Sequence, residues 1–388
     1  MRWSDDRILT THVGSLPRGE PLTSLLLAEE KDEMVDRVEL SEAMRSAVET
    51  AAVSQAECGI DIACDGEMPR VGFSTYVPRR MSGFSGESVR PLPLDAKYYP
   101  KWFEWMQRSG LRRARVYNAP EAVSEISYDD LSPVEAECKM FRRAIEKLPG
   151  RFLETFMTAA SPGIVVTTMM NRHYDSHEAY LLAVARELKK EYRYIIDAGF
   201  TLQIDAPDLA MERAGFFQNQ SLSQFQKFVG MHIEALNCAL DGIPSDKVRL
   251  HACWGNRNSP HVHDVPCPEI LPLLYEAKVG AISLPFANPR HAHEVEAFRD
   301  HPLPDHMILM PGVIETVTNY VEHPEVVAER LNRAVEATGD RERVVASTDC
   351  GFSTLAGDAF VAEDVVWAKL SALVEGAEIA SRRLWGHR

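Results

Sequence analysis

The sequence predicts an α/β protein with the (β/α)8 TIM-barrel fold and an insertion between the second and third strands. Three observations favour this fold. Eight short apolar or β-branched runs end in small or polar residues, amphipathic helical segments follow most of them, and no GxGxxG turn follows any. The last observation argues against a doubly wound open sheet. The chain has 388 residues and is 45% hydrophobic, which is ample for one large core.

The expected strands are near-continuous apolar runs, as parallel strands covered on both faces require. FTLQIDAP and VVASTDCG, for example, each pass from apolar residues to small and polar ones. In chain order, the strands are expected at residues 8–15, 60–67, 151–163, 200–207, 248–256, 281–288, 306–314 and 344–351.

The expected helices lie between these strands. Residues 177–199 carry apolar side chains at helical spacing and close on Gly199. Further helices are expected at residues 222–242, 269–280 and 324–339. Residues 71–150 are too many for a simple crossover, so we expect a helical insertion there. We interpret residues 1–388 as one catalytic domain, with this insertion over one end of the barrel.

Composition excludes several classes of partner. The formal net charge of -15 argues against nucleic acid and anionic membranes, because both require a basic face. No run approaches the ~18 apolar residues that a membrane span needs. The seven cysteines are odd in number and lack a disulfide spacing, so we expect a reducing cytoplasm, where thiols stay free, react or bind metal.

The residues at the strand ends indicate what the barrel does, because barrels of this kind carry their active sites at the carboxyl ends of the strands. Carboxylates, thiols and imidazoles dominate the set and would converge on one rim. The expected rim residues are His12, Ser15, Asp65, Glu67, Ser161, Asp205, His251, Cys253, Asn256, Asn288, Arg290, Glu315, Asp349 and Cys350.

The stretch HACWGN is the strongest candidate for a metal site. His251 and Cys253 are two residues apart on an expected strand, so both side chains point to the same face. Imidazole and thiolate together suit Zn(II), and Cys350 at the end of the eighth strand is the natural third ligand. The alternative is a buried thiol beside a hydrogen-bonded histidine. Three ligands with an open position would make a catalytic site rather than a structural one.

Other polar residues have simpler alternatives. Asp65, Glu67 and Asp205 could cap the helices that follow them. His261 and His263 look like a second metal motif, but they follow the strand in a proline-rich loop. That position favours a solvated or loop-ordering role.

Several motifs together resemble the cobalamin-independent methionine synthase family. The resemblance runs in order from about residue 8 to residue 375, and the insertion carries little of it. It is closest to the short members that look like the catalytic C-terminal half of the full-length synthase, a group that includes the epoxyalkane:coenzyme M transferases. The motifs that carry it are THVGSLPR, DGEMPR, TAASPG, NRHY, LQIDAPDLA, HACWGN, FANPRH, PGVIETVTNYVEHPE and STDCGF.

The resemblance implies a zinc-dependent thiol S-methyltransferase in which a zinc-bound substrate thiol is ionised and alkylated at sulfur. His251, Cys253 and Cys350 fall on the family's zinc-binding positions. The family positions that bind the amino-acid part of homocysteine fall on Ser15, Glu67 and Asp205; Asn288 is a further candidate in the FANPRH motif.

Two departures from the family pattern stand out. The family's fourth zinc ligand is a glutamate, and Pro285 occupies that position here. Either three protein ligands leave a position for water or substrate, or another carboxylate, Glu294 or Asp349, replaces the glutamate. The family's histidine acid is also missing, and the segment reads ETVTN. Glu315 or a water would then manage proton transfer, with His12 as a further candidate donor.

The identity of the thiol stays open at this point. Glu67 and Asp205 favour an amino-acid thiol such as homocysteine, whereas coenzyme M, a sulfonate, would need arginines instead. The methyl donor could be a folate, a small methylated compound or a corrinoid protein. The chain could also form a homo-oligomer. The alternatives outside this class are a metal-free enzyme like uroporphyrinogen decarboxylase and a descendant that has lost catalysis.

Overall fold

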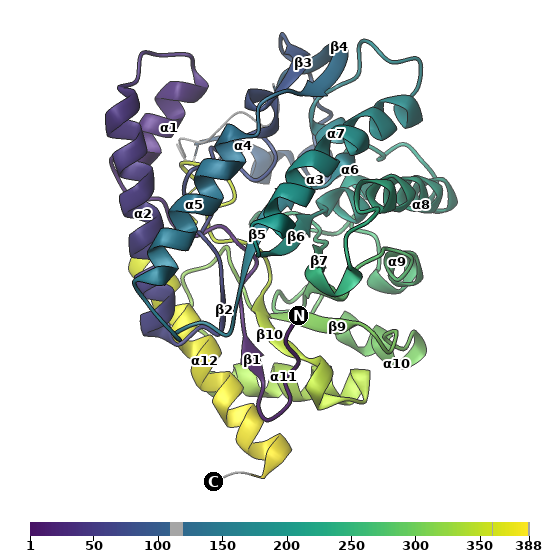
Figure 1. Ribbon diagram of the computed structural model, residues 1–388. Coiled ribbons are helices and arrows are strands. Elements are labelled where there is room, and N and C mark those ends of the chain that lie inside the picture. The colour runs from purple at the N-terminus through teal and green to yellow at the C-terminus, as the bar shows by residue number, and fades with distance from the viewer. Residues whose placement is uncertain (109–118, 359, 387–388) are drawn as a thin grey trace.

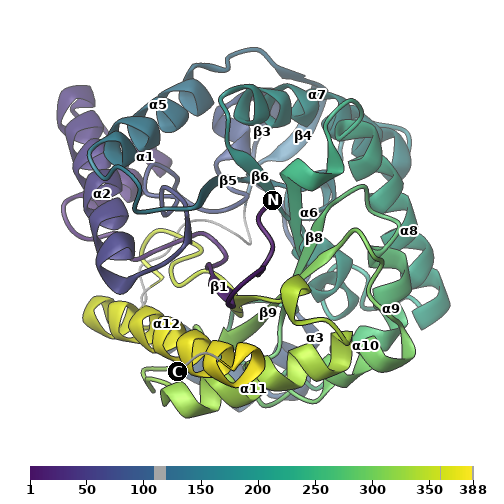
Figure 2. The same cartoon turned by 60° about the horizontal axis from the view of Figure 1, so that its bottom comes forward.

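Eight parallel strands form the central sheet in the order β1–β10–β9–β8–β7–β6–β5–β2. The computed structural model describes residues 1–108, 119–358 and 360–386 (Figure 1). A parallel bridge between Thr11 and Ile62 joins the two end strands, so the sheet closes into a barrel. Figure 2 shows the helices arranged as a ring around it. The TIM-barrel prediction is confirmed. The strands are β1 (Leu9–Thr10), β2 (Ile62–Ala63), β5 (Glu154–Ala160), β6 (Thr201–Asp205), β7 (Val248–His251), β8 (Ala281–Pro285), β9 (Ile308–Ile314) and β10 (Val345–Thr348).

The helices begin and end where local sequence signals place them. In α8, Ser221 and Gln224 form a reciprocal capping box at the N-terminus. In α2, the Asp36 carboxylate accepts two backbone N–H groups, and Gly59 ends the helix at φ 83°. The helices of four or more residues are α1 (Leu22–Glu30), α2 (Arg37–Cys58), α3 (Leu94–Tyr98), α4 (Pro100–Arg108), α5 (Ser132–Glu146), α6 (Pro162–Thr168), α7 (His177–Asp197), α8 (Leu222–Ala239), α9 (Cys267–Leu274), α10 (Ala297–Asp300), α11 (Pro324–Thr338) and α12 (Glu363–Trp385).

The inside of the barrel holds a charged residue among apolar ones. Leu9, Phe156 and Met310 belong to a separate buried cluster, against which the N-terminal Met1 and Trp3 pack. The Arg249 guanidinium lies 4.1 Å from the centre of the Phe156 ring. It also donates hydrogen bonds to Thr11 Oγ1 at 3.1 Å and to the His12 carbonyl oxygen at 3.0 Å. These acceptors, together with the ring face, satisfy part of the donor capacity of a guanidinium that is 1% exposed.

The segment between β2 and β5 is not only helical. It contains α3 and α4, but also an antiparallel pair formed by β3 (Met81–Ser85) and β4 (Glu121–Tyr128). The expectation of a purely helical insertion was therefore wrong for this pair of strands. The last helix of the segment, α5, packs against α2 and α7 and therefore belongs to the outer ring of the barrel.

The insertion packs on the carboxyl rim of the barrel. The Leu94 amide donates to the Ala214 carbonyl oxygen at 2.9 Å, in the loop that follows β6. Trp102 Nε1 donates to the Asn258 carbonyl oxygen at 2.9 Å, in the loop that follows β7. These contacts place the insertion beside the barrel end at which the strand-end residues converge.

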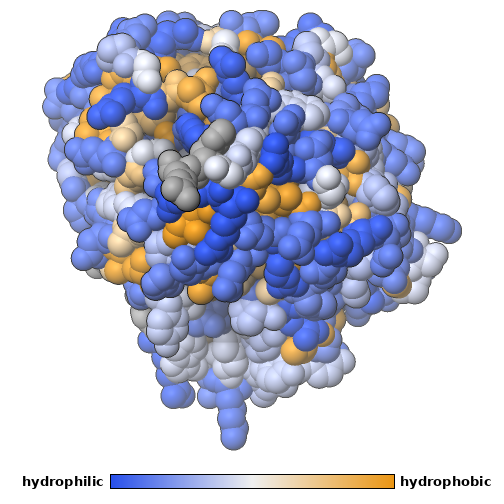
Figure 3. All heavy atoms as spheres, turned by 90° about the horizontal axis from the view of Figure 1, so that it is seen from below, coloured by the Kyte–Doolittle hydropathy of each residue, from blue (hydrophilic) through white to orange (hydrophobic). Residues whose placement is uncertain are grey.

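The outer surface carries the expected mixture of side chains. Hydrophilic residues dominate the face in Figure 3, with hydrophobic residues between them. Within residues 1–108, 119–358 and 360–386, no helix combines the length and apolarity needed to cross a membrane.

A buried ion network joins the insertion to the ring. Glu137 on α5 accepts from Arg70 at 2.9 Å and also pairs with Arg80. Arg80 reaches Glu191 on α7 at 3.3 Å, and the Tyr76 hydroxyl donates to the same carboxylate at 2.7 Å. The side chains of the two arginines and the two glutamates are each at most 5% exposed. Removing one partner would leave buried arginines without a counter-charge.

We therefore predict that Glu137→Gln lowers the free energy of unfolding by about 3 kcal/mol, within the range for breaking a buried ion pair. Urea denaturation followed by circular dichroism measures this change. Glu135→Gln on the same helix is the control, because Glu135 only pairs with the exposed Lys139 four residues on. An equal effect of the two substitutions would show that the network contributes no more than a surface pair.

Candidate metal centre and substrate cavity

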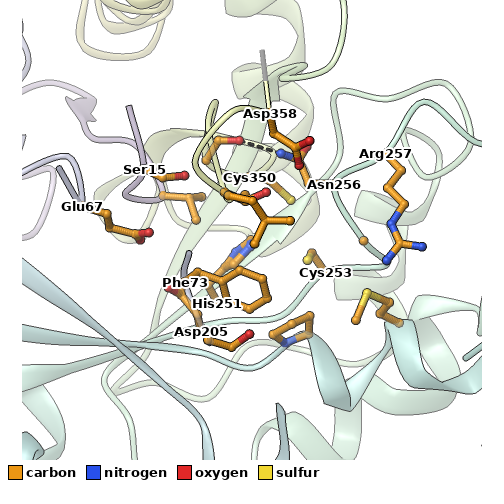
Figure 4. A pocket seen from close by; sticks show the side chains of 18 of the residues that line it. Ser15, Glu67, Phe73, Asp205, His251, Cys253, Asn256, Arg257, Cys350 and Asp358 are labelled. Atoms are coloured by element: carbon orange, nitrogen blue, oxygen red, sulfur yellow. Dashed lines mark hydrogen bonds between the residues drawn. The ribbon is translucent and has the colours of Figure 1, made fainter. Parts of the chain in front are cut away.

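The ends of β7 and β10 bring three metal-ligating side chains together. His251 is the last residue of β7, Cys253 follows two residues later, and Cys350 lies two residues beyond β10. One ligand atom from each lies within 4.8 Å of the others, and all three residues are buried. Figure 4 shows the two sulfur atoms and the imidazole facing one another at the cavity. The predicted convergence of these residues is therefore present in the structure.

Backbone contacts hold both cysteine loops in place. The Ala252 amide donates to the Ser283 carbonyl oxygen at 3.1 Å, and the Cys253 carbonyl oxygen accepts from the Met211 amide at 3.2 Å. Thr348 Oγ1 donates to the Cys350 carbonyl oxygen at 2.8 Å. These contacts fix the backbone from which each thiol projects.

Asn256 joins three of the rim loops. Its amide nitrogen donates to the Gly351 carbonyl oxygen at 2.7 Å, shown by the dashed line in Figure 4. Its amide oxygen accepts from Thr316 Oγ1 at 2.9 Å. The last residue of HACWGN therefore links the loop after β7 to those after β10 and β9.

The electrostatics of the three residues suit a cation. The hydrogen bond with Cys350 lowers the pKa of Cys253 well below that of an ordinary thiol, and His251 lowers it further. The same hydrogen bond, together with burial, raises the pKa of Cys350. Within the described part of the chain, His251 Nδ1 is buried without a hydrogen-bond partner. A buried thiolate beside a thiol and an imidazole is the donor set that a soft or borderline divalent ion prefers.

Two buried acidic groups lie beside these residues in a cavity of about 280 Å³. Burial raises the pKa of Asp205 to about 8, and the neighbouring Glu67 contributes. Burial likewise raises the pKa of Glu67. The described residues provide no hydrogen-bond partner for Glu67 Oε2, whereas Asp205 Oδ1 accepts from Gln203 Nε2 at 2.7 Å. Such a pair favours a cationic ligand.

Glu67 lines the cavity and has an unusual backbone conformation. This residue has φ 55°, a left-handed conformation that residues other than glycine rarely adopt. The Asp65 carboxylate accepts its amide hydrogen at 2.9 Å, and Arg18 donates to its carbonyl oxygen at 2.7 Å. Asp65 therefore orders a turn rather than capping a helix, because no helix directly follows β2 in the part of the chain that is described, while Glu67 faces the cavity.

Four residues outside the expected rim set complete the cavity wall, and sequence reasoning missed all of them except Arg257. Phe73 and Arg90 come from the insertion, and Met211 and Arg257 come from the loops after β6 and β7. Arg90 forms an ion pair with the buried Glu212. Arg257 could be expected near the rim because it directly follows HACWGN. The insertion residues could not, because the strand positions do not show which part of the insertion folds over the rim.

A second cavity of about 260 Å³ also borders Cys253 and Cys350. Its wall includes Asn288, predicted to bind substrate, and Glu315, predicted to manage proton transfer. The Glu315 carboxylate accepts from the Val317 amide at 2.8 Å and from Thr318 Oγ1 at 2.5 Å. Asn288 Oδ1 accepts the Arg290 and His291 amides at 3.0 Å each. The structure does not bring these two residues to the cavity of Glu67 and Asp205, because their loops turn toward the other pocket.

His12 is a third predicted residue that lies away from the cavity. It is 1% exposed, and its Nε2 is 2.7 Å from Gln55 Oε1. Burial lowers its pKa to about 4. His12 borders none of the cavities found at the rim, so its predicted role as a proton donor has no geometric support in the described residues.

Neither carboxylate expected to replace the glutamate at Pro285 is free to do so. Both oxygens of Asp349 accept backbone amides, from Ala287 at 2.8 Å and Asn288 at 2.9 Å. Glu294 accepts the Cys267 amide at 3.0 Å and lies 2.6 Å from His291 Nδ1. In the described chain, the group that shares one ion site therefore consists of the imidazole and the two thiols.

Comparison with known protein families shows to which family the chain belongs. Residues 153–377 match the family described as cobalamin-independent synthase, catalytic domain. The chain belongs to this family. The match confirms the resemblance that the motifs predicted and the prediction of an enzyme.

Individual relatives are distant but cover nearly the whole chain. A methionine synthase of Thermococcus kodakarensis is 24% identical over 97% of this chain and 94% of its own. A 2-hydroxypropyl-CoM lyase of Xanthobacter autotrophicus is also 24% identical, over 89% and 87%. A solved B12-independent methionine synthase from a Shewanella species has TM-score 0.72 and 22% identity, covering 98% of this chain and all (100%) of that one. At this identity the structural likeness supports the fold alone.

We predict that Gly14→Ala destabilises the protein by about 1–2 kcal/mol, the cost typical of strain at a left-handed position. Gly14 has φ +151°, and an added Cβ would lie 2.8 Å from Glu67 Oε1. Gly19→Ala is the matched control, because no heavy atom lies within 4 Å of its added Cβ. Thermal unfolding of both variants tests this, and equal melting temperatures would contradict it.

Proposed function

We propose that the protein is a zinc-dependent thiol S-methyltransferase that transfers a methyl group to homocysteine or a similar amino-acid thiol. The observation that carries this proposal is the position of His251, Cys253 and Cys350 on the same cavity as Glu67 and Asp205. A soft-metal ligand set beside two buried acids suits a substrate with a thiol at one end and an ammonium group at the other.

The donor set fits Zn(II). Imidazole and thiolate are its usual protein ligands, and three of them leave a fourth position for substrate. Pro285 cannot coordinate, which supports three protein ligands rather than four. When bound, zinc would stabilise the ionised form of a substrate thiol at neutral pH.

The remaining residues would bind and orient the substrate. We infer that Glu67 and Asp205 accept hydrogen bonds from its ammonium group, which would also favour their ionised forms. Ser15 and its loop would contact the substrate carboxylate. Phe73 and Met211 would exclude water from the reacting sulfur, and the fixed cavity wall would orient the thiol toward the methyl carbon.

The methyl donor is a second small molecule in this proposal, and a corrinoid protein is the macromolecular alternative. We place the reaction in a reducing cytoplasm, because all seven cysteines are free thiols.

A second candidate function is alkylation of coenzyme M. The relative from Xanthobacter autotrophicus is named for that thiol, and Arg90 and Arg257 line the cavity where a sulfonate could bind. Arg90 already pairs with Glu212, whereas the two acids beside the metal ligands would repel a sulfonate. Assays with homocysteine and coenzyme M, each with methyl donors and with epoxypropane, distinguish the two functions.

We predict that Cys253→Ser removes one equivalent of zinc per chain and abolishes thiol methylation, because it replaces a thiolate ligand. Metal analysis of the purified protein measures the zinc content. Cys238→Ser is the control, since Cys238 is exposed on α8. Unchanged zinc content in Cys253→Ser would contradict the assignment of this residue as a ligand.

We further predict that Asp205→Asn lowers kcat/KM for homocysteine by about 10–100-fold, as expected for one charge-assisted hydrogen bond of about 1.5–3 kcal/mol. The same variant should act almost normally on 4-mercaptobutanoate, which is homocysteine without its ammonium group. An equal loss with both thiols would show that Asp205 does not recognise the ammonium group.

A further inference from the structure

A second group of metal-ligating side chains lies outside the proposed zinc site. His261 and Asp264 are in the loop after β7, and His291 is in the loop after β8. Their ligand atoms all lie within 4.8 Å of one another. We call these three residues the loop cluster. It shares no residue with the group formed by His251, Cys253 and Cys350.

The two histidines of the loop cluster converge on one oxygen atom. His261 Nδ1 lies 2.7 Å from Asp264 Oδ2, and His291 Nε2 lies 3.0 Å from the same oxygen. The outer nitrogens also have acceptors: His261 Nε2 is 3.0 Å from the Arg257 carbonyl oxygen, and His291 Nδ1 is 2.6 Å from Glu294 Oε2. Without an ion, both rings must carry two protons to satisfy all four contacts.

This orientation is the one that metal-binding histidines adopt. A ligating imidazole usually donates its other N–H to a carboxylate or a backbone carbonyl, which fixes the tautomer and aims the free nitrogen at the ion. His291 has the carboxylate of Glu294 for this purpose, and His261 has the carbonyl of Arg257. Their inner nitrogens both point at Asp264.

The cavity next to the cluster provides a second, independent observation. A space of about 40 Å³ is lined by His261, Asp264 and Asp95. Asp95 is 7% exposed and accepts the His261 amide through Oδ2 at 2.9 Å. Its Oδ1 is buried and has no hydrogen-bond partner among the described residues. A buried carboxylate oxygen left open beside this cluster is suited to a cation or its bound water.

We propose that His261, Asp264 and His291 bind a second divalent first-row transition-metal ion. Two imidazole nitrogens and one carboxylate oxygen coordinate Zn(II), Co(II) or Fe(II) readily. The ion replaces the inner N–H proton of each histidine, and both protons leave to solvent. Because one divalent ion replaces two protons, the net charge of the loop cluster together with Glu294 is unchanged. The unpartnered Asp95 oxygen accepts a hydrogen bond from water in the adjoining space.

A metal here would stabilise the loop that begins at the zinc site. Trp254 directly follows Cys253, and its ring stacks on His291 with centroids 3.9 Å apart and an interplanar angle of 11°. Its Nε1 donates to the Val265 carbonyl oxygen at 2.7 Å. The second ion would therefore hold residues 254–265 against the loop after β8, beside one wall of each cavity.

Metal titration of the full chain tests the proposal with Zn(II) and Co(II) as probes. Wild-type protein should bind two ions per chain, and Asp264→Asn should bind one. Cys253→Ser/Cys350→Ser should also retain one, with a cobalt spectrum that lacks thiolate charge-transfer bands. His263→Gln is the matched control. This histidine is in the same loop, but its ring contacts Tyr98 at 4.6 Å, and the variant should bind two ions.

The outcomes separate this proposal from the proposed function. One ion in wild type, unchanged in Asp264→Asn and lost in the cysteine variant, would overturn the second site and leave the zinc site intact. The reverse pattern would retain the second site and overturn the zinc-dependent methyltransferase. The cobalt spectra of wild type at one and two equivalents need no variant, so misfolding of Asp264→Asn does not affect them. A second equivalent that adds no bands would overturn the proposal.

Discussion

Closure of the barrel is the constraint on which the proposed site depends. β7 and β10 are separated in the sheet by β8 and β9, and their cysteines are far apart in sequence. Closing eight parallel strands directs all carboxyl ends toward one rim, where His251, Cys253 and Cys350 meet. Short backbone contacts then fix the chain from which each thiol projects. Any change that opened the sheet would separate the ligands before it altered their chemistry.

The second determinant is a pair of buried acidic groups whose pKa values are raised by burial. Glu67 and Asp205 are buried beside each other, whereas the carboxylates of Glu137 and Glu191 are paired with arginines. Burying acids without a counter-ion costs folding free energy. The strained backbone of Glu67 adds to that cost. Such destabilising features are typical of a binding site, and a cationic ligand beside the two acids would favour their ionised forms.

The loop after β7 connects several parts of the rim. It carries Cys253, borders both cavities, bonds to the loops after β9 and β10 through Asn256, and stacks on the loop after β8 through Trp254. The insertion covers it through Trp102 and Asp95. The geometry of the thiols therefore depends on contacts that extend well beyond the ligands themselves.

The sequence by itself determined the strand count, the main helices and the residues at the strand ends. These features can be predicted because the spacing of apolar residues and the ends of apolar runs depend only on residues that are neighbours in the chain. HACWGN and STDCGF could be assigned to one site on that basis. Only the tertiary structure decided which cavity each residue faces. It separated Asn288 and Glu315 from Asp205, buried His12 away from both cavities, and brought Arg90 from the insertion into the wall. Those outcomes depend on how loops of different lengths pack against one another, and no local pattern encodes that packing.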